Sequence, residues 1–522
     1  MATFALPSPA TSAGTDPIVV MTDKGPVRGI DGDGVRVFKG IPYAAAPSGN
    51  LRWALPEEQK RWRGTLNATA FRSGCPQVSR YGQTEAGYNE DCLFINVTVP
   101  KVTVPEKLAV FVWIYGGAFV GGSTSLYPLA HLATMGHVIV VSMNYRLGAF
   151  GFMAHPAFDR ATDGDYGQAD QRAALRWVQR NIAAFGGDPH NVTIAGESAG
   201  AASVCMQMLS PAAARGLFQK AIVQSAGCVQ HLRTTDERDV LGLKVAAAVG
   251  CRGRTEATLS CMRRKSVKAL IEAAAKEGGS DVMSFAPGIG TASAPLQGTE
   301  AMRSGRFVEV PMINGGDQNE LRLYVAYAAR LGQHITNANY AASLMAVYGA
   351  KATEVLAEYP LTNFSSAPAA LGSVMSDFTP SNGLNNCLYL QTARLASRHV
   401  SVFEYEFTDA NAPPVTPDPG FEMGAVHSSE LPYQFPGFDN TSKADGAALS
   451  VPAAILSDKM IRYWTAFART GTPAAPDQIA WTPFESSAAV LRLDESTTTY
   501  FDAGAAHHCA FWQKLYPNLL SR

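Results

Sequence analysis

The sequence has no block of like charge and no long hydrophobic run. The chain of 522 residues carries a formal net charge of −1, with 43 Lys and Arg against 44 Asp and Glu. We therefore expect neither nucleic acid nor an anionic membrane surface as a partner. The most apolar stretches, residues 108–114 and 138–143, have at most seven residues. That length is typical of a buried strand and too short for a membrane-spanning helix.

The sequence also lacks a C-x-x-C pair, although it has 8 cysteines. This absence argues against a zinc ribbon and against a thioredoxin-like redox site. We expect no metal and no organic cofactor. The residues alone leave the disulfide connectivity open, and eight buried thiols are an alternative.

The N-terminus lacks the features of a secretory signal peptide. No basic residue precedes Lys24, and the first apolar run is short. We expect residues 1–16 to be a disordered or linker start of a mature chain. Residues 17–522 are then expected to fold as a single domain, with residues 230–305 as an insertion between core strands. The sequons include those that begin at Asn67, Asn363 and Asn440, and the sequence leaves their glycosylation open.

Short apolar segments rich in Val and Ile alternate with helical patterns. Buried strands are expected at residues 95–99, 109–114, 138–143, 192–195, 221–224, 310–313, 402–407 and 490–493. Apolar residues recur at helical spacing in residues 169–185 and 460–468. Turn residues near 25–26 and 31–34 indicate N-terminal hairpins. This alternation predicts an α/β fold, in which a mostly parallel mixed sheet has helices on both faces.

One segment has the pattern of a serine nucleophile on a sharp turn. Residues 192–204 read VTIAGESAGAASV, so an apolar strand leads into Gly196-Glu197-Ser198-Ala199-Gly200 and then into an Ala-rich helix. This is the G-x-S-x-G elbow in the strand–turn–helix context of the α/β-hydrolase fold. The turn exposes the Ser198 hydroxyl, and the helix start directs the Ala199 N–H at a developing oxyanion. With 47 glycines the five-residue pattern alone is weak, so the flanking strand and helix carry the assignment.

A glycine-rich loop follows an earlier buried strand. Residues 109–122 read AVFVWIYGGAFVGG, and this fold places its second oxyanion donor in such a loop. Tyr115 stands where many esterases have His, and Ala118 where many have Gly. Neither departure removes a backbone N–H.

A serine hydroxyl needs a base, and the base needs an acid to orient it. His427 lies in a polar loop after the strand at 402–407, as the order Ser, acid, His requires. His507 and His508 are adjacent to a C-terminal helix, and we expect them at the surface. The acid should follow the strand at 310–314, where the sequence continues GGDQNE. Both Asp317 and Glu320 meet this condition.

The residues resemble the type-B carboxylesterase/lipase family, which includes bacterial p-nitrobenzyl esterases, animal carboxylesterases and cholinesterases. The resemblance runs from about residue 17 to residue 517. It rests on FKGIPYA (38–44), GNLRW (49–53), NEDCLFINV (89–97), WIYGGAFVGGS (113–123), NYRLGAFGF (144–152), DQRAALRWVQRNIAAFGGDPHNVTIAGESAG (170–200), DQNE (317–320) and HSSELPY (427–433).

This resemblance implies a serine carboxylesterase that uses a triad of Ser198, Glu320 and His427 on a small-molecule ester. It further implies backbone oxyanion donors at Gly117, Ala118 and Ala199, with supporting roles for Glu197 and Ser225. Asp317 is then expected to cap the loop. The family alternatives are an interfacial lipase, whose lid would come from residues 280–305 or 321–345, and a non-catalytic adhesion protein. The intact set of three residues argues against the adhesion protein.

The resemblance also implies structural pairs. Two ion pairs are expected, Arg52 with Glu90 and Arg146 with Asp170. Three disulfides are expected, Cys75–Cys92, Cys251–Cys261 and Cys387–Cys509, which would leave Cys205 and Cys228 free. This pattern is typical of a secreted or periplasmic protein. The 75–92 loop contains no Trp to hold a quaternary ammonium group, so efficient cholinesterase activity is not expected.

Overall fold

The computed structural model describes residues 18–77, 87–102, 107–162, 164–279, 281, 283–438 and 448–520. The expected linker at residues 1–16 and the sequon at Asn440 lie outside these ranges. Asn67 and Asn363 are both exposed. Within the same ranges, no helix is long and apolar enough to cross a membrane.

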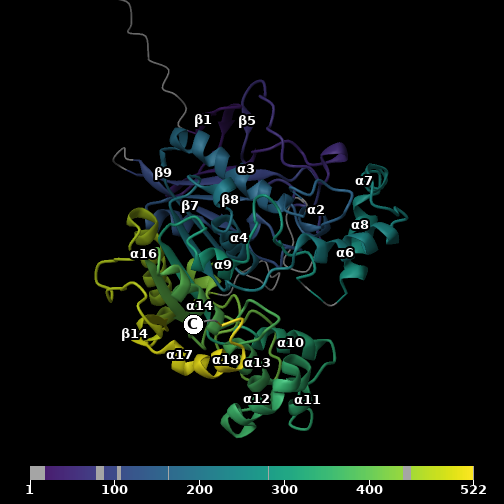
Figure 1. Ribbon diagram of the computed structural model, residues 1–522. Coiled ribbons are helices and arrows are strands. Elements are labelled where there is room, and N and C mark those ends of the chain that lie inside the picture. The colour runs from purple at the N-terminus through teal and green to yellow at the C-terminus, as the bar shows by residue number, and fades with distance from the viewer. Residues whose placement is uncertain are drawn as a thin grey trace, which may run out of the picture.

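The described residues form a large mixed sheet with helices packed around it (Figure 1). The strand order in this 11-stranded sheet is β14-β13-β12-β11-β10-β9-β7-β8-β6-β4-β3. Its members are β3 (Ile30–Asp31), β4 (Val35–Pro42), β6 (Phe94–Pro100), β7 (Leu108–Ile114), β8 (Ile139–Met143), β9 (Gly187–Glu197), β10 (Lys220–Gln224), β11 (Met312–Asp317), β12 (Val402–Phe407), β13 (Val490–Leu493) and β14 (Thr498–Phe501). A separate 3-stranded sheet contains β1 (Val19–Thr22), β2 (Gly25–Arg28) and β5 (Leu66–Asn67).

The predicted strands and hairpins are present. The eight predicted strands correspond to β6 through β13. Seven of them are parallel neighbours in the spatial order β8-β7-β9-β10-β11-β12-β13. The two predicted hairpins are the antiparallel pairs β1–β2 and β3–β4. Every residue of β7 is buried, as expected for a strand covered on both faces.

The α-helices are α1 (Ala130–Gly136), α2 (Gly148–Phe152), α3 (Tyr166–Asn181), α4 (Ala199–Met208), α5 (Pro211–Ala214), α6 (Thr235–Ala248), α7 (Glu256–Arg263), α8 (Val267–Gly278), α9 (Gly298–Arg303), α10 (Arg322–Arg330), α11 (Tyr340–Tyr348), α12 (Ala352–Glu358), α13 (Ala367–Asp377), α14 (Asn386–Ala396), α15 (Leu431–Gln434), α16 (Val451–Thr470), α17 (Ala503–Ala506) and α18 (Cys509–Leu515). Local sequence sets their ends. The Ser450 hydroxyl accepts a hydrogen bond from Ala453 N–H at the start of α16, and Gly471 ends that helix at φ 82°.

Strand register brings the functional segments to one edge of the sheet. Ile114 pairs with Gly196, Glu197 with Gln224, and Gln224 with Gly315. The segments that follow β7, β9, β10 and β11 therefore begin side by side. Ligand sites in open α/β sheets lie at this carboxyl edge.

Four disulfides join described segments of the chain. The three bridges implied by the resemblance, Cys75–Cys92, Cys251–Cys261 and Cys387–Cys509, are present. The expectation that Cys205 and Cys228 are free is wrong, because they are bonded to each other. Cys205 lies on α4 and Cys228 follows β10, and these two elements pack together because β9 and β10 are parallel neighbours.

The two expected ion pairs are also present. Arg52 binds Glu90 through two hydrogen bonds of 2.7 Å each. Arg146 binds Asp170 in the same bidentate manner, with both bonds at 2.8 Å. Such forked pairs fix geometry as well as charge.

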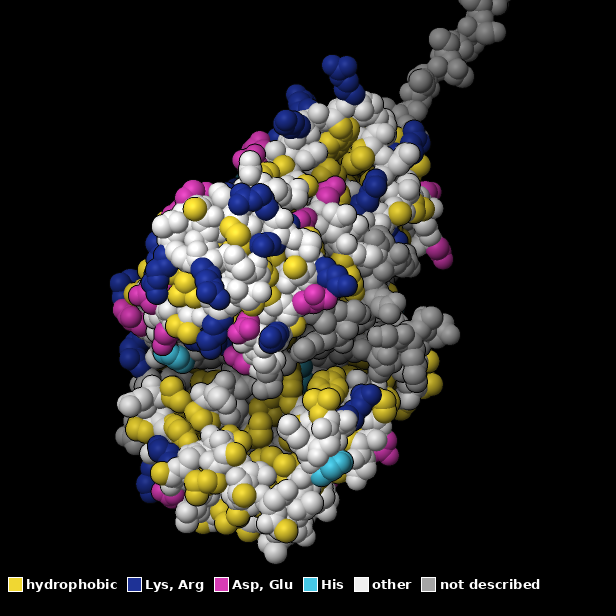
Figure 2. Space-filling model, turned by 90° about the vertical axis from the view of Figure 1, so that its right-hand side faces the viewer, with side chains coloured by type: hydrophobic (Ala, Val, Ile, Leu, Met, Phe, Trp, Pro, Cys, Tyr) yellow, Lys and Arg dark blue, Asp and Glu magenta, His cyan; other side chains and the backbone are white. Residues whose placement is uncertain are grey.

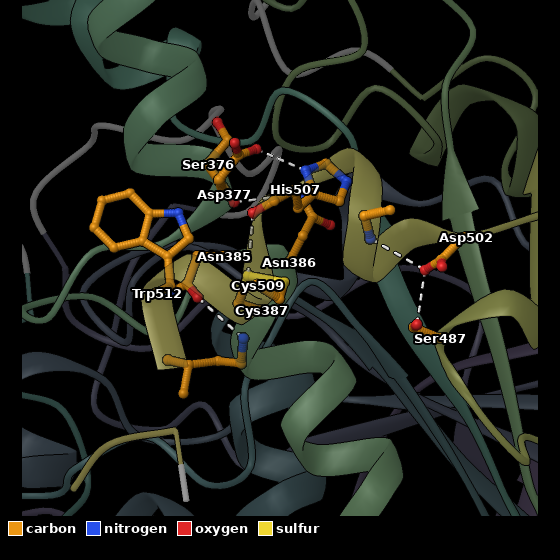
Figure 3. Close-up of a disulfide and its surroundings, with 12 residues drawn as sticks. Ser376, Asp377, Asn385, Asn386, Cys387, Ser487, Asp502, His507, Cys509 and Trp512 are labelled. Atoms are coloured by element: carbon orange, nitrogen blue, oxygen red, sulfur yellow. Dashed lines mark hydrogen bonds and ion pairs between the residues drawn. A yellow bond between two sulfur atoms is a disulfide. The ribbon is translucent and has the colours of Figure 1, made fainter. Parts of the chain in front are cut away.

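His507 is not at the surface, contrary to expectation. Its imidazole is buried between two carboxylates, 2.6 Å from Asp377 Oδ1 and 2.7 Å from Glu406 Oε2. Figure 3 shows His507 and Asp377 beside the Cys387–Cys509 bridge. Burial lowers the pKa of His507, but Glu406 and Asp377 outweigh it and raise that pKa to about 10. The imidazolium thus joins the C-terminal segment to α13 and β12.

We expect this arrangement to make stability depend on pH. The pKa of His507 rises from 6.5 to about 10 on folding, so its stabilisation is complete below pH 6.5 and is lost as the pH approaches 10. His507→Gln should lower the free energy of unfolding by about 3–5 kcal/mol at pH 6, since it leaves buried carboxylates without their cation. The loss should be smaller at pH 10. Urea unfolding at both pH values measures it.

His508→Gln is the matched control. The His508 side chain is 41% exposed and contacts one carboxylate, Glu358. An exposed pair of this kind contributes about 0–1 kcal/mol. Equal losses for the two variants, or a loss at His507 that is the same at both pH values, would contradict the proposed ionic role.

Candidate active site

Ser198 lies on a strained turn between β9 and α4, at φ 57° and ψ −124°. The turn is tight because two glycines allow close backbone contact. A Cβ at Gly200 would lie 2.0 Å from the Ile114 carbonyl oxygen, and one at Gly196 would lie 2.5 Å from the carbonyl carbon of Gly200. The sequence pattern thus folds as the elbow that it predicts.

The structure brings Ser198, His427 and Glu320 into one hydrogen-bonded row. Ser198 Oγ lies 2.8 Å from His427 Nε2, and His427 Nδ1 lies 2.6 Å from Glu320 Oε2. Glu320 is fully buried, while His427 is 4% exposed. The three residues come from separate segments, with a sequence separation of 107 between the histidine and the carboxylate. This arrangement can transfer the serine proton to the imidazole and hold the imidazole in one tautomer.

Glu320 is held by donors that the local sequence does not reveal. Its Oε1 accepts hydrogen bonds from Tyr389 OH at 2.8 Å and from Asp317 N–H at 3.1 Å. A Cβ at Gly316 would lie 2.5 Å from the same oxygen, so glycine leaves room for the carboxylate. Tyr389 lies on α14 within NNCLYL, where nothing in the adjacent residues marks it as a partner of a distant glutamate.

Asp317 does not cap the loop, contrary to expectation. The strand β11 extends beyond the predicted strand end, so Asp317 is its last residue and is fully buried. Its side chain faces the carboxyl group of Glu430. Position after the strand cannot separate Asp317 from Glu320, but the contacts do, because Glu320 faces His427 Nδ1.

Three backbone N–H groups are available near Ser198. Gly117 and Ala118 lie in the glycine-rich loop at φ 111° and φ 54°, and Ala199 is the first residue of α4. None of these N–H groups donates a hydrogen bond to another described residue. Unpaired donors beside a nucleophile are what an oxyanion hole requires.

Glu197 is close to the histidine, whereas the Ser225 hydroxyl makes no hydrogen bond to a described residue. Glu197 Oε1 lies 3.3 Å from His427 Nε2 and accepts a hydrogen bond of 2.7 Å from Ser428 Oγ. Burial raises the pKa of Glu197 to about 8, against the opposing effect of His427. Ser225 Oγ is buried and has no partner among the same residues. Of the two residues with an implied supporting role, Glu197 therefore contacts His427 through its side chain, and the Ser225 hydroxyl has no such contact.

The carboxylates alter the basicity of His427. Burial lowers the pKa of His427, but Glu197 and Glu320 outweigh it and raise that pKa to about 9. A raised pKa favours the imidazolium form of His427. It also means that the neutral imidazole, which is the form that can accept a proton, is populated only at higher pH.

We expect Glu197→Gln to move the pH profile. Removing this negative charge lowers the pKa of His427, so the rising limb of kcat/KM should move to lower pH. The amide oxygen of glutamine can still accept from Ser428 Oγ, which preserves the local structure. Initial rates on p-nitrophenyl acetate between pH 5 and 10 test this, because the midpoint of the limb follows the pKa of His427. Glu404→Gln, which alters a buried carboxyl on β12 bonded to Asn314, is the control. An unchanged limb in Glu197→Gln would disprove the electrostatic role.

Ser198 and His427 line a pocket whose empty space, open solvent included, is about 530 Å³, while Glu320 lies behind them and does not line it. Besides the catalytic candidates, its walls include Leu126, Tyr127, Leu323, Tyr324, Tyr327, Leu431 and Phe438. Tyr324 on α10 faces His427 with ring centroids 5.9 Å apart. Of the two expected lid regions, residues 321–345 contribute a pocket wall through α10. On the side of the molecule that carries α8 and α10, the surface is hollowed and hydrophobic side chains gather there (Figure 2).

Comparisons with known proteins agree with this geometry. Residues 16–512 match the carboxylesterase family. The chain is 32% identical to the fumonisin B1 esterase of Sphingopyxis macrogoltabida, over 92% of this chain and 88% of that protein. It is 33% identical to the para-nitrobenzyl esterase of Bacillus subtilis, over 96% and 99%. The solved structure of a thermophilic PNB esterase superposes with a TM-score of 0.79 and 30% identity, covering 94% of this chain and 99% of that one.

The fold is therefore that of the α/β-hydrolases. The chain belongs to the carboxylesterase family, and it is a carboxylic ester hydrolase.

Proposed function

We propose that Ser198, His427 and Glu320 carry out ester hydrolysis in two steps. Ser198 Oγ attacks the ester carbonyl while His427 Nε2 accepts its proton, and the alcohol leaves with that proton to give an acyl-enzyme. Water, deprotonated by His427, then releases the acid and regenerates Ser198. The observation that carries this proposal is the continuous row from Ser198 Oγ to Glu320, with spacings of 2.8 and 2.6 Å.

The other site residues have electrostatic roles in this proposal. The N–H groups of Gly117, Ala118 and Ala199 stabilise the negative oxygen of each tetrahedral intermediate. Glu320 orients the imidazole and stabilises its positive charge. Neither step requires a metal or an organic cofactor.

The substrate in this proposal is a small ester that carries no positive charge. Away from Glu197, Ser198, His427 and Ser428, the cavity walls are mainly aromatic and aliphatic, which suits uncharged acyl and alcohol groups. The 75–92 loop contains no Trp, which removes one source of cation–π attraction for choline. The 32% identity to a fumonisin B1 esterase makes fumonisin B1 a further substrate to test.

An ester panel tests both the reaction and its range. We expect hydrolysis of p-nitrophenyl esters from acetate upward, with higher kcat/KM for short acyl chains than for long ones. Acetylthiocholine should have no higher kcat/KM than an uncharged thioester of equal size. The panel also includes fumonisin B1. Rates that increase sharply above the solubility limit of a long-chain ester would instead identify an interfacial lipase.

We also propose that residues 17–522 act as one domain in an oxidising compartment, secreted or periplasmic. Four disulfides, including the buried pair Cys205–Cys228, support this assignment. Cell fractionation with thiol labelling of the extracted protein tests it. Eight labelled thiols in freshly extracted protein would contradict it.

A further inference from the structure

Two further carboxyl groups, those of Asp317 and Glu430, are buried close to the catalytic candidates. Asp317 ends β11, and Glu430 immediately precedes α15, and both are 0% exposed. Neither carboxyl oxygen of Asp317 accepts a hydrogen bond from an N–H or O–H group in the described part of the chain. The same holds for Glu430 Oε2. The carboxyl group of Glu430 faces that of Asp317.

Two ionised carboxylates cannot bond to each other, because both are acceptors. A contact of this kind, fully removed from water, is stable when one member carries a proton and donates it to the other. We propose that Asp317 and Glu430 form a carboxylic acid–carboxylate pair that holds one proton and positions Glu320 and His427 for catalysis. The positioning part of this inference rests on the proposed roles of Glu320 and His427.

The surroundings place the proton on Asp317. Glu430 Oε1 accepts a hydrogen bond of 3.4 Å from Gln224 Nε2, which favours the charged form of Glu430. No comparable donor from the described residues reaches the Asp317 carboxyl. Burial raises the pKa of both groups, so one proton is retained by the pair. Asp317 is therefore the donor and Glu430 the acceptor.

The charges that face the pair explain why a proton is retained there. Glu320 from the loop after β11 and Glu197 from the end of β9 both oppose ionisation of Asp317. His427 favours ionisation of Glu430. The remaining titratable neighbours are the phenols of Tyr389 on α14 and Tyr405 on β12. With Asp317 ionised, four carboxylates would face a single imidazole.

The pair also connects the segments that carry the three catalytic candidates. The carboxylate atoms of Asp317 and Glu320 and a ring nitrogen of His427 lie within 4.8 Å of one another. Asp317 N–H donates to Glu320 Oε1 at 3.1 Å, and Glu430 lies three residues after His427. Gln224, which donates to Glu430, accepts the Ser198 N–H through its backbone oxygen at 2.9 Å. Loss of the shared proton would place two negative charges in contact at this junction.

Loss of that proton at alkaline pH should therefore lower kcat. Repulsion between Asp317 and Glu430 would separate the strand end that supports Glu320 from the loop that carries His427. The wild-type enzyme should accordingly have a falling alkaline limb in kcat. Asp317→Asn replaces the acid with an amide of the same shape that donates to Glu430 at every pH.

The test compares the kcat profiles of wild type, Asp317→Asn and Glu404→Gln on p-nitrophenyl acetate from pH 6 to 10.5. We expect Asp317→Asn to keep kcat within about threefold of wild type at pH 7.5 and to lose the alkaline limb, along which wild-type kcat falls about tenfold per pH unit. Glu404→Gln, which alters a buried carboxyl that does not contact His427, should keep the wild-type limb. Circular dichroism at each pH separates this limb from unfolding.

Glu430→Gln is the second variant, since it removes the other carboxyl and should also abolish the limb. Infrared difference spectra of wild type minus Asp317→Asn at pH 7.5 should contain the C=O stretch of a protonated carboxyl group. Coincident alkaline limbs in wild type and Asp317→Asn, or the absence of that stretch, would overturn the inference. An enzyme that fails to hydrolyse esters at any pH would instead overturn the catalytic assignment, which keeps the two failures distinct.

Discussion

Ser198→Ala should lower kcat on p-nitrophenyl acetate by about 10⁴–10⁶-fold, as removal of the nucleophile does in other serine hydrolases. The Ser198 hydroxyl is the oxygen in contact with His427 Nε2, at 2.8 Å, so the variant has no group to form the acyl-enzyme. Alanine keeps the Cβ and removes one oxygen, so the elbow at φ 57° has no new steric conflict. Steady-state kinetics and thermal unfolding of the same preparation measure both consequences.

Residual turnover in Ser198→Ala would report on the backbone N–H groups that remain in the site. The N–H groups of Gly117, Ala118 and Ala199 remain, so a rate somewhat above the uncatalysed reaction is consistent with their proposed role. Ser203→Ala is the matched control, because Ser203 is a buried serine on α4 that bonds Gln171 and does not reach the cavity. It should keep kcat within about threefold while costing a hydrogen bond worth about 1 kcal/mol. Near-normal turnover by Ser198→Ala would remove Ser198 from the mechanism.

The sheet and the elbow at Ser198 are predictable from the sequence because their signals are local. An all-buried strand such as β7 is visible as a continuous apolar run, and the elbow needs five adjacent residues between a strand and a helix. The position of His427 follows from chain order once the fold is recognised. Its contact with Glu320 does not, because the two residues are 107 positions apart and the register of β11 sets their distance.

The errors in the sequence-based predictions involve partners that are distant in the chain. Cys205 pairs with Cys228 because β9 and β10 are neighbours, a relation that neither cysteine's local sequence contains. The C-terminal segment around His507 has the pattern of a surface, but Asp377 and Glu406 enclose the imidazole from α13 and β12. The apolar run at 310–313 ends before β11 does, so the sequence places Asp317 in a loop. In each case a buried polar or sulfur-bearing group has a neighbour that only the tertiary fold supplies.

The choice of Glu320 over Asp317 as the acid has a sharp consequence. Glu320→Gln should lower kcat by about 10³–10⁴-fold with a small change in KM, because the acid acts on the imidazole and does not bind substrate. The hydrogen bonds explain why a neutral isostere fails. Tyr389 OH and Asp317 N–H both donate to Oε1, so the carbonyl oxygen of the introduced glutamine should take that place. Its amide NH₂ would then face His427 Nδ1.

An NH₂ group at that position would hold His427 in the wrong tautomer. Nδ1 would have to accept a hydrogen bond, which puts the ring proton on Nε2, the atom that must receive the proton of Ser198. Asp317→Asn should cost little at pH 7.5, because asparagine can donate to Glu430 in the proposed pair and the backbone N–H that donates to Glu320 is unchanged. Kinetics of both variants on p-nitrophenyl acetate, with folding checked by circular dichroism, decide between the two residues. If Asp317→Asn is the variant with the large loss of kcat at that pH, the acid has been assigned to the wrong residue, while the Ser198–His427 contact remains.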